Sequence, residues 1–194
     1  TLYLVMKKKS TPYQNRNLYL HANNKVWYDK LLYPGRTTNC MISMQASSED
    51  SQYASVISIL TPMYMDELSA WKDTTPEHRG ESYRSFKKEK TKQLLRFIRS
   101  HGIDFSDNIE EIHTTTPLSY RDYTGTVDGS AYGIIKDYKC PQIGFVSTRS
   151  RLGNLFLTGQ NLNVHGALGV TLTSMLTCAE FVGQEYLAKK VGNA

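Results

Sequence analysis

The stretch YASVISILT, residues 53–61, decides the fold class more than any other part of the sequence. Its β-branched residues favour an extended strand, and turn-forming residues separate it from segments of similar character. YPG at 33–35 and SEDS at 48–51 are two of these predicted turns. Because no helix-like stretch comes between the strand segments, we expect an antiparallel sheet. The other strand segments are residues 2–6, 17–22 and 37–47.

The pattern changes to a helical one after the fourth strand. Residues 66–71 suggest a short helix, and Thr75–Pro76–Glu77 has the composition of a helix start, with an N-cap threonine, a proline and an acid. We expect this second helix to run to about His101 with apolar residues gathered on one face. A further strand is predicted over residues 109–115.

The C-terminal part has a strand, a glycine-containing loop and a helix in succession. We expect a short buried strand over residues 154–158 and one long helix from Gly166 to about Lys189. The first amides of a helix have no partner within it, and with the helix dipole they attract negative charge. Gly166 and Gly169 would let a flat or anionic ligand approach these amides. The pattern predicts either a ligand site or tight packing of the helix on the strand.

YRDYTGTVDGSAYG, residues 120–133, combines tyrosines with glycines spaced by four. It lacks the apolar period of a helix or a strand, so we expect a loop. Glycines allow the backbone to pass near a planar ring, and tyrosines offer flat apolar surface to a hydrophobic substrate. The loop therefore either lines a binding site or lies on the surface with its tyrosines covering a core.

Two segments together resemble a known protein family. NLFLTGQNLNVHGALGVTLTSMLTCAEFVG (154–183) resembles the C-terminal flavin-binding segment of the phytoene desaturase, carotenoid isomerase and retinol saturase family. HTTTPLSYRDYTGTVDGSAYG (113–133) resembles the segment that precedes it there. The resemblance covers roughly residues 113–187, and residues 1–112 agree only in general character. It implies an FAD-dependent oxidoreductase that exchanges a hydride between the flavin and a conjugated or isoprenoid hydrocarbon, in saturation, desaturation or isomerisation.

The resemblance also implies which residues contact the ligands. Amides at the helix start would face the pyrimidine end of the flavin and stabilise its reduced, anionic form. Many relatives have an acid where this chain has Gln160, so no role that needs a carboxylate is implied. The cofactor-binding residues would be Gly159, Gln160, Gly166, Ala167, Leu168 and Gly169. The substrate-binding residues would be Tyr120, Tyr123, Gly129, Ser130, Tyr132 and Gly133, and no catalytic acid or base is assigned.

These flavoproteins bind the FAD pyrophosphate through an N-terminal G-x-G-x-x-G. This chain has no two glycines separated by one residue, and it opens on TLYLVM as if within a strand. We therefore expect a C-terminal fragment that is inactive and holds FAD weakly without the N-terminal half of the same polypeptide. Residues 1–115 would be the substrate-binding part and residues 116–194 the flavin-contacting segment. The expected fold class is α+β: an antiparallel or mixed sheet with a long amphipathic helix, then a strand–helix unit from a flavin-binding domain.

Composition and charge narrow the remaining function classes. The net charge is +5, but acids are interleaved with the bases and no RNA-binding motif is present, so nucleic acid is not an expected partner. No apolar run reaches the ~20 residues of a membrane span. The three distant cysteines argue against a disulfide framework and for a cytoplasmic location. No metal site is expected from the five scattered histidines, of which His165 would either approach the flavin or satisfy the loop backbone.

The basic stretch between Arg79 and Arg99 leaves a second function open. Its cations and apolar side chains could lie at an anionic lipid surface, or form a solvated face over a packed one. The first alternative would place the protein at the membrane periphery. It is also the basis of the rival function, a non-catalytic domain that binds a lipid or a membrane surface.

Overall fold

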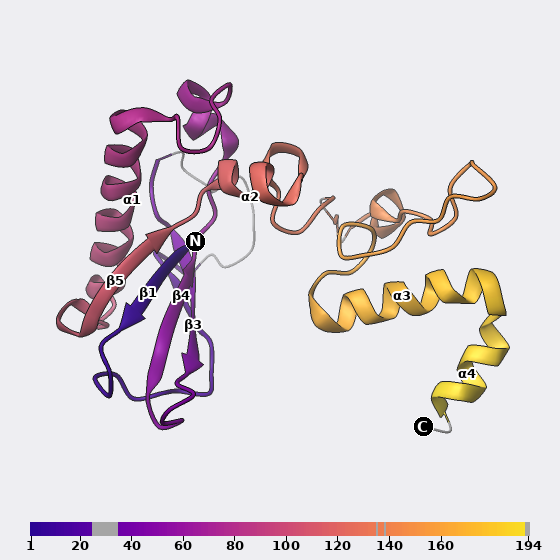
Figure 1. The fold of residues 1–194 in the computed structure, drawn as a ribbon, viewed down its shortest axis with the longest axis horizontal. Helices are drawn as coiled ribbons and strands as arrows, with labels where there is room; N and C mark the ends of the chain where they lie inside the picture. The colour runs from indigo at the N-terminus through magenta and orange to yellow at the C-terminus, as the bar shows by residue number, and fades with distance from the viewer. Residues whose placement is uncertain (25–34, 135, 138, 193–194) are drawn as a thin grey trace. The chain divides into compact units, whose positions relative to one another are not determined.

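The computed structural model describes residues 1–24, 35–134, 136–137 and 139–192. They form two compact units, Thr1–Gly129 and Ser130–Ala194 (Figure 1). This division by packing is distinct from the functional division suggested at residue 115, which stays a prediction. Tyr33 and Pro34 of the first predicted turn lie outside the described residues.

The first unit is built on a five-stranded antiparallel sheet with the order β2-β3-β4-β1-β5. The strand segments predicted in this unit are confirmed, and with them the α+β class and the antiparallel sheet. The first strand lies between the fourth and the fifth, so β1 and β4 are both central. The strands are β1 (Leu2–Met6), β2 (Leu18–His21), β3 (Asn39–Ala46), β4 (Ala54–Leu60) and β5 (Ile109–Thr114).

One face of the sheet is apolar because the register aligns apolar residues across neighbouring strands. Leu4 of β1 pairs with Ile57 of β4 and with Ile112 of β5. Leu4 and Ile57 are fully buried, whereas Ile112, on the edge strand, is 42% exposed. The alternation of side chains along each strand thus places the apolar set of several strands on one face.

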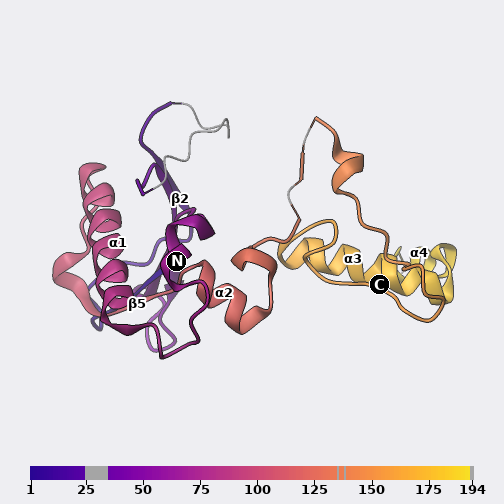
Figure 2. The same cartoon turned by 90° about the horizontal axis from the view of Figure 1, so that it is seen from above.

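The helix α1 (Gly80–Ser100) runs alongside the sheet and covers this apolar face (Figures 1 and 2). Its residues Leu94 and Ile98 are buried in one cluster with the residues of the sheet. Farther toward its N-terminus, Tyr83 is buried in a second cluster with Leu68, and Phe86 packs against it. The apolar face of α1 therefore packs inside the unit, which leaves only its charged face for a lipid surface.

The start of α1 corrects one prediction. The helix was expected to begin at Thr75–Glu77, but it begins at Gly80. The segment before it forms a turn, in which the amide of His78 donates to the carbonyl of Thr75 at 3.2 Å. Glu77 has a φ of 68°, in the left-handed region, so a helix cannot continue through it. The predicted short helix is present as a 3-10 helix, Met65–Trp71.

The second unit differs from the expectation in two elements. Residues 154–158 form no strand, since their only pairing among the described residues is one bridge between Arg149 and Phe156. The predicted single helix is two helices, α3 (Gly166–Val182) and α4 (Gln184–Gly192). Gly183 separates them: its φ of 85° and ψ of 147° leave the helical region.

The second unit has little hydrophobic interior. Leu162 is the one buried hydrophobic residue among those described from residue 130 onward. By contrast, large apolar side chains of α3 are exposed, although the helix is mostly apolar in composition. The exposed ones are Leu168, Leu172, Met175, Leu176, Phe181 and Val182.

In the described part of the chain, no helix is both long and apolar enough to cross a membrane.

Cys40 is buried in the core, and burial raises the pKa of its thiol to about 11. Cys140 and Cys178 are exposed free thiols.

We predict that Ile57→Ala lowers the free energy of unfolding by about 2–5 kcal/mol, because it leaves a cavity in the central strand. The matched control is Ile112→Ala, the same change in the same cross-strand row at the exposed edge. It should cost about 1 kcal/mol or less, because much of that side chain is already in water. Urea unfolding of both variants measures the difference, and equal costs would contradict the assigned register.

Candidate functional site

Two of the three predicted substrate-binding tyrosines, Tyr120 and Tyr123, lie on a helix. This corrects the expectation of a loop for residues 120–124, whereas residues 125–133 form a loop with one 3-10 turn. The helix α2 (Pro117–Thr124) has Pro117 at its first position, and the Ser119 hydroxyl accepts from the Thr116 amide at 3.2 Å. Gly125, with a φ of 69°, ends it. These are strong helix-start and helix-stop signals, but the short apolar pattern between them hides the helix from a periodicity argument.

Tyr120 and Tyr123 have different surroundings on α2. The Tyr120 hydroxyl lies 2.8 Å from the Thr1 hydroxyl, so this side chain is anchored within the first unit. Tyr123 is 75% exposed. The two tyrosines thus differ in burial: Tyr120 is partly buried, and Tyr123 lies at the surface.

Gly129 approaches its own chain closely. A Cβ atom there would lie 2.0 Å from the carbonyl oxygen of Pro117, and its φ is 64°. The loop after α2 folds back onto the helix start, and only glycine fits at the contact. The absence of a side chain at Gly129 thus serves internal packing.

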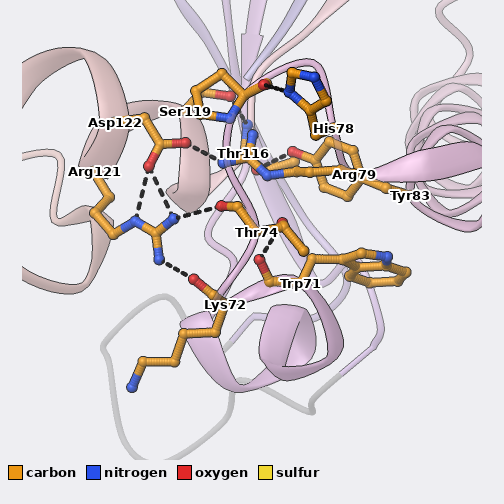
Figure 3. A network of polar contacts seen from close by, with 11 residues as sticks. Trp71, Lys72, Thr74, His78, Arg79, Tyr83, Thr116, Ser119, Arg121 and Asp122 are labelled. Atoms are coloured by element: carbon orange, nitrogen blue, oxygen red, sulfur yellow. Dashed lines mark hydrogen bonds and ion pairs between the residues drawn. The ribbon is translucent and has the colours of Figure 1, made fainter.

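A buried network of charges fixes α2 to the segment before α1 (Figure 3). Asp122 accepts hydrogen bonds from Arg79 and, at 2.9 Å, from Arg121. Arg121 also donates to the carbonyls of Lys72 and Thr74. The side chains of Arg79 and Asp122 are 8% and 11% exposed, and the Nε of Arg79 has no partner. Sequence reasoning missed this network, because nothing in the sequence connects positions 79 and 122.

The electrostatics of Asp122 follow from these contacts. Burial alone would raise the pKa of Asp122, but the hydrogen bonds and charges of Arg79 and Arg121 outweigh it and lower that pKa below its ordinary value. The carboxylate therefore stays charged at neutral pH and holds both guanidinium groups.

In the second unit, two of the segments that carry the family resemblance contact one another. A Cβ atom at Gly133 would lie 2.6 Å from the Cα of Asn161, so the loop that begins at Ser130 is pressed against the loop before α3. Ser130 donates to the Gly133 carbonyl at 2.8 Å and closes this turn. The ring of Tyr132 lies 4.6 Å from the ring of His165, centre to centre.

Two residues that sequence reasoning missed hold the loop before α3. The amine of Lys136 donates to the carbonyls of Gly144, at 2.6 Å, and Leu162. The Asn163 side chain makes two hydrogen bonds of 2.8 Å with the backbone of Val146. An isolated lysine or asparagine in a loop has no sequence signal for such a role.

At the N-terminus of α3, the first residues are exposed to solvent, whereas Gly169 is covered by the chain itself. His165 is the N-cap residue, and its side chain makes no capping hydrogen bond, so it does not satisfy the helix amides. Leu168 is 74% exposed, and the stretch from His165 to Leu168 is exposed throughout. At Gly169, by contrast, a Cβ atom would lie 2.5 Å from the carbonyl carbon of Val164. Gly169 thus packs against the chain itself.

Gly159 and Gly166 both have a backbone conformation that favours glycine, but neither is packed closely against another described part of the chain. Their φ values are 103° and 78°, and a Cβ atom at either would meet nothing within 4 Å. Gln160 is exposed beside Gly159. The structure thus brings Tyr132, His165 and the amides from Gly166 onward to one region of the second unit.

Within the residues described, no three His, Cys, Asp or Glu side chains gather as metal ligands would. The open region at the α3 N-terminus therefore offers hydrogen-bond donors of the backbone and an aromatic pair as its chemistry. Such a region suits an anionic or planar ligand.

No protein-family model matches the chain, and a search of curated proteins finds no matching relative.

We predict that Asp122→Asn lowers the free energy of unfolding at pH 7 by about 3–5 kcal/mol, because it leaves two guanidinium groups without their carboxylate. The pKa of Asp122 is lowered in the folded state, so its contribution is complete above the unfolded pKa of about 4 and is lost as the pH falls further. Stability should therefore fall less steeply below pH 4 in the variant than in the wild type.

The control for this prediction is Asp107→Asn, the same change on an exposed side chain. It should change the free energy of unfolding by about 0.5 kcal/mol or less. Urea unfolding between pH 2.5 and 7, about the range over which a lowered carboxylate titrates, measures both effects. Parallel pH profiles for Asp122→Asn and the wild type would contradict the network.

Proposed function

We propose that the chain is the C-terminal part of an FAD-dependent oxidoreductase that acts on a hydrophobic conjugated or isoprenoid substrate. The observation that carries this proposal is the open N-terminus of α3, uncapped by His165 and bordered by the loop of Tyr132 and Gly133. These are the two segments in which the sequence resembles the phytoene desaturase and retinol saturase family. Their contact within one unit supports a shared ligand.

The exposed residues at the start of α3 could contact the flavin, whereas the buried Gly169 could not. The amides of Gly166, Ala167 and Leu168 would hold the pyrimidine end, because they are exposed and the helix dipole favours negative charge there. Gly169 would not contact the ring, because Val164 occupies its surface. When bound, FAD supplies acceptance or delivery of a hydride, and this chain supplies orientation and stabilisation of the charge that results.

The apolar surface of α3 supports the proposal that further polypeptide completes this unit. A helix that is apolar on all sides is normally buried in the core of a larger domain or in a membrane. The second unit has almost no hydrophobic interior of its own. In the proposed enzyme, α3 would pack within the nucleotide-binding half, which carries the G-x-G-x-x-G that this chain lacks.

The test compares Ala167→Asp with Ala167→Asn in the product of the full gene. Both changes are compatible with the second position of a helix, and Asp there even suits the dipole. A negative charge at this position would repel the reduced, anionic flavin, whereas the amide of nearly equal size would not.

We expect the full-length protein to purify yellow, with a flavin spectrum that dithionite bleaches. Ala167→Asp should lower the flavin affinity about tenfold or more, and Ala167→Asn about threefold or less. A colourless full-length protein, or equal effects of the two variants, would refute the proposal.

The exposed apolar face of α3 also favours a second candidate, a non-catalytic domain that binds a lipid or membrane surface. In that case the 194-residue chain would sediment with liposomes of neutral lipid, and Leu172→Glu with Leu176→Glu would abolish sedimentation. The control changes two other exposed positions of α3 that carry small side chains, Thr171→Glu and Cys178→Glu. A chain that stays in the supernatant would exclude this candidate.

A further inference from the structure

A pocket opens in the first unit where the ends of β1, β4 and β5 meet α1. Its empty space, including open solvent at its mouth, is about 540 Å³. It lies in the part of the chain expected to bind substrate, but none of the predicted substrate-binding or cofactor-binding residues lines it. Its wall has an apolar part and a cationic part.

The described charged residues of the pocket wall are three cations, Arg36, Lys87 and Lys90, and one acid, Glu67. Lys90 forms an ion pair with Glu67, which is the one acid in the wall among the described residues. Lys87 also lines the pocket, and it makes no ion pair within the described part of the chain. Arg36 adds a further cation at the exposed rim.

Lys87 is half-buried, and the burial leaves its charge poorly compensated. Burial, and then the charge of Arg79, lower the pKa of Lys87 below its ordinary value. Among the described residues, the positive charge of Lys87 is stabilised by a cation–π contact with the ring of Tyr83, whose centre lies 5.7 Å from the amine. A half-buried cation without an acid is costly, and an anionic ligand group would remove that cost.

The apolar part of the wall lies next to this amine. Leu2, Met63, Phe86 and Leu94 contribute to it, and several threonines also line the pocket. An inorganic phosphate would gain Lys87 and the exposed Arg36 here, but it would also lose water to an apolar surface that offers it no partner. A ligand with one negative charge and a hydrocarbon body matches both parts.

We propose that this pocket binds a monocarboxylate with a medium-length hydrocarbon chain, with the carboxylate at Lys87 and the chain against Met63 and Phe86. The inference does not depend on the proposed oxidoreductase function, because all of these residues lie in the first unit.

The experiment titrates octanoate into the 194-residue chain and follows the backbone amides by NMR. We expect saturable shifts at pocket residues such as Leu94 and Thr114, which the wild type should not show with inorganic phosphate. Octanol, which lacks the charge, and butyrate, which lacks the chain, should each bind about tenfold or more weakly.

The variant Lys87→Gln should weaken octanoate binding about tenfold or more, while Lys88→Gln should change it by about twofold or less. Lys88 is the matched control, because it is the next residue on α1 and is exposed outside the pocket wall. Thermal unfolding confirms that both variants fold. Absent or non-saturable shifts, equal binding by both variants, or tighter binding of phosphate than of octanoate would overturn the proposal.

Discussion

Burial of the two central strands beneath α1 is the interaction on which the first unit depends. Leu4 and Ile57 face each other across β1 and β4, and Leu94 and Ile98 close the cluster from the helix. This contact joins residues at the start, middle and end of the unit. The apolar face of α1 is used for this contact, so several of its cations, such as Lys88 and Arg96, are exposed. Lys87 and Lys90 are partly buried and line the pocket at the end of the sheet.

The second unit is held by other means. Its loops are fastened by polar contacts, through Lys136 and Asn163, and by close backbone packing at Gly133 and Gly169. These contacts fix the path of the backbone without burying much apolar area. The apolar side chains of α3 consequently remain exposed, and this is the physical reason to propose that further polypeptide packs against them.

The two proposed sites use different physics. At the start of α3 the ligand would be recognised by unpaired backbone amides, so the side chains there can be small. At the end of the sheet the ligand would be recognised by one lysine and an apolar wall, so the side chains carry the specificity. The charge network of Arg79, Asp122 and Arg121 has no reactive role in either proposed site. Its role is structural: it fixes α2, whose N-cap residue Thr116 lies in the pocket wall.

Local sequence alone determined the strands of the first unit and the existence of its long helix, because alternation and β-branching act over a few neighbouring residues. It also indicated the glycine positions at the α3 start. It did not determine the place of β1 between β4 and β5, the partnership of Arg79 with Asp122, or the packing of Gly133 on Asn161. It also misjudged 154–158 as a strand and 120–124 as loop; the caps of that short helix are local, but its apolar pattern is too short to show it. The strand order, the Arg79–Asp122 pair and the Gly133–Asn161 contact depend on which distant segments meet, and the free energy of such contacts is realised only once the chain has folded.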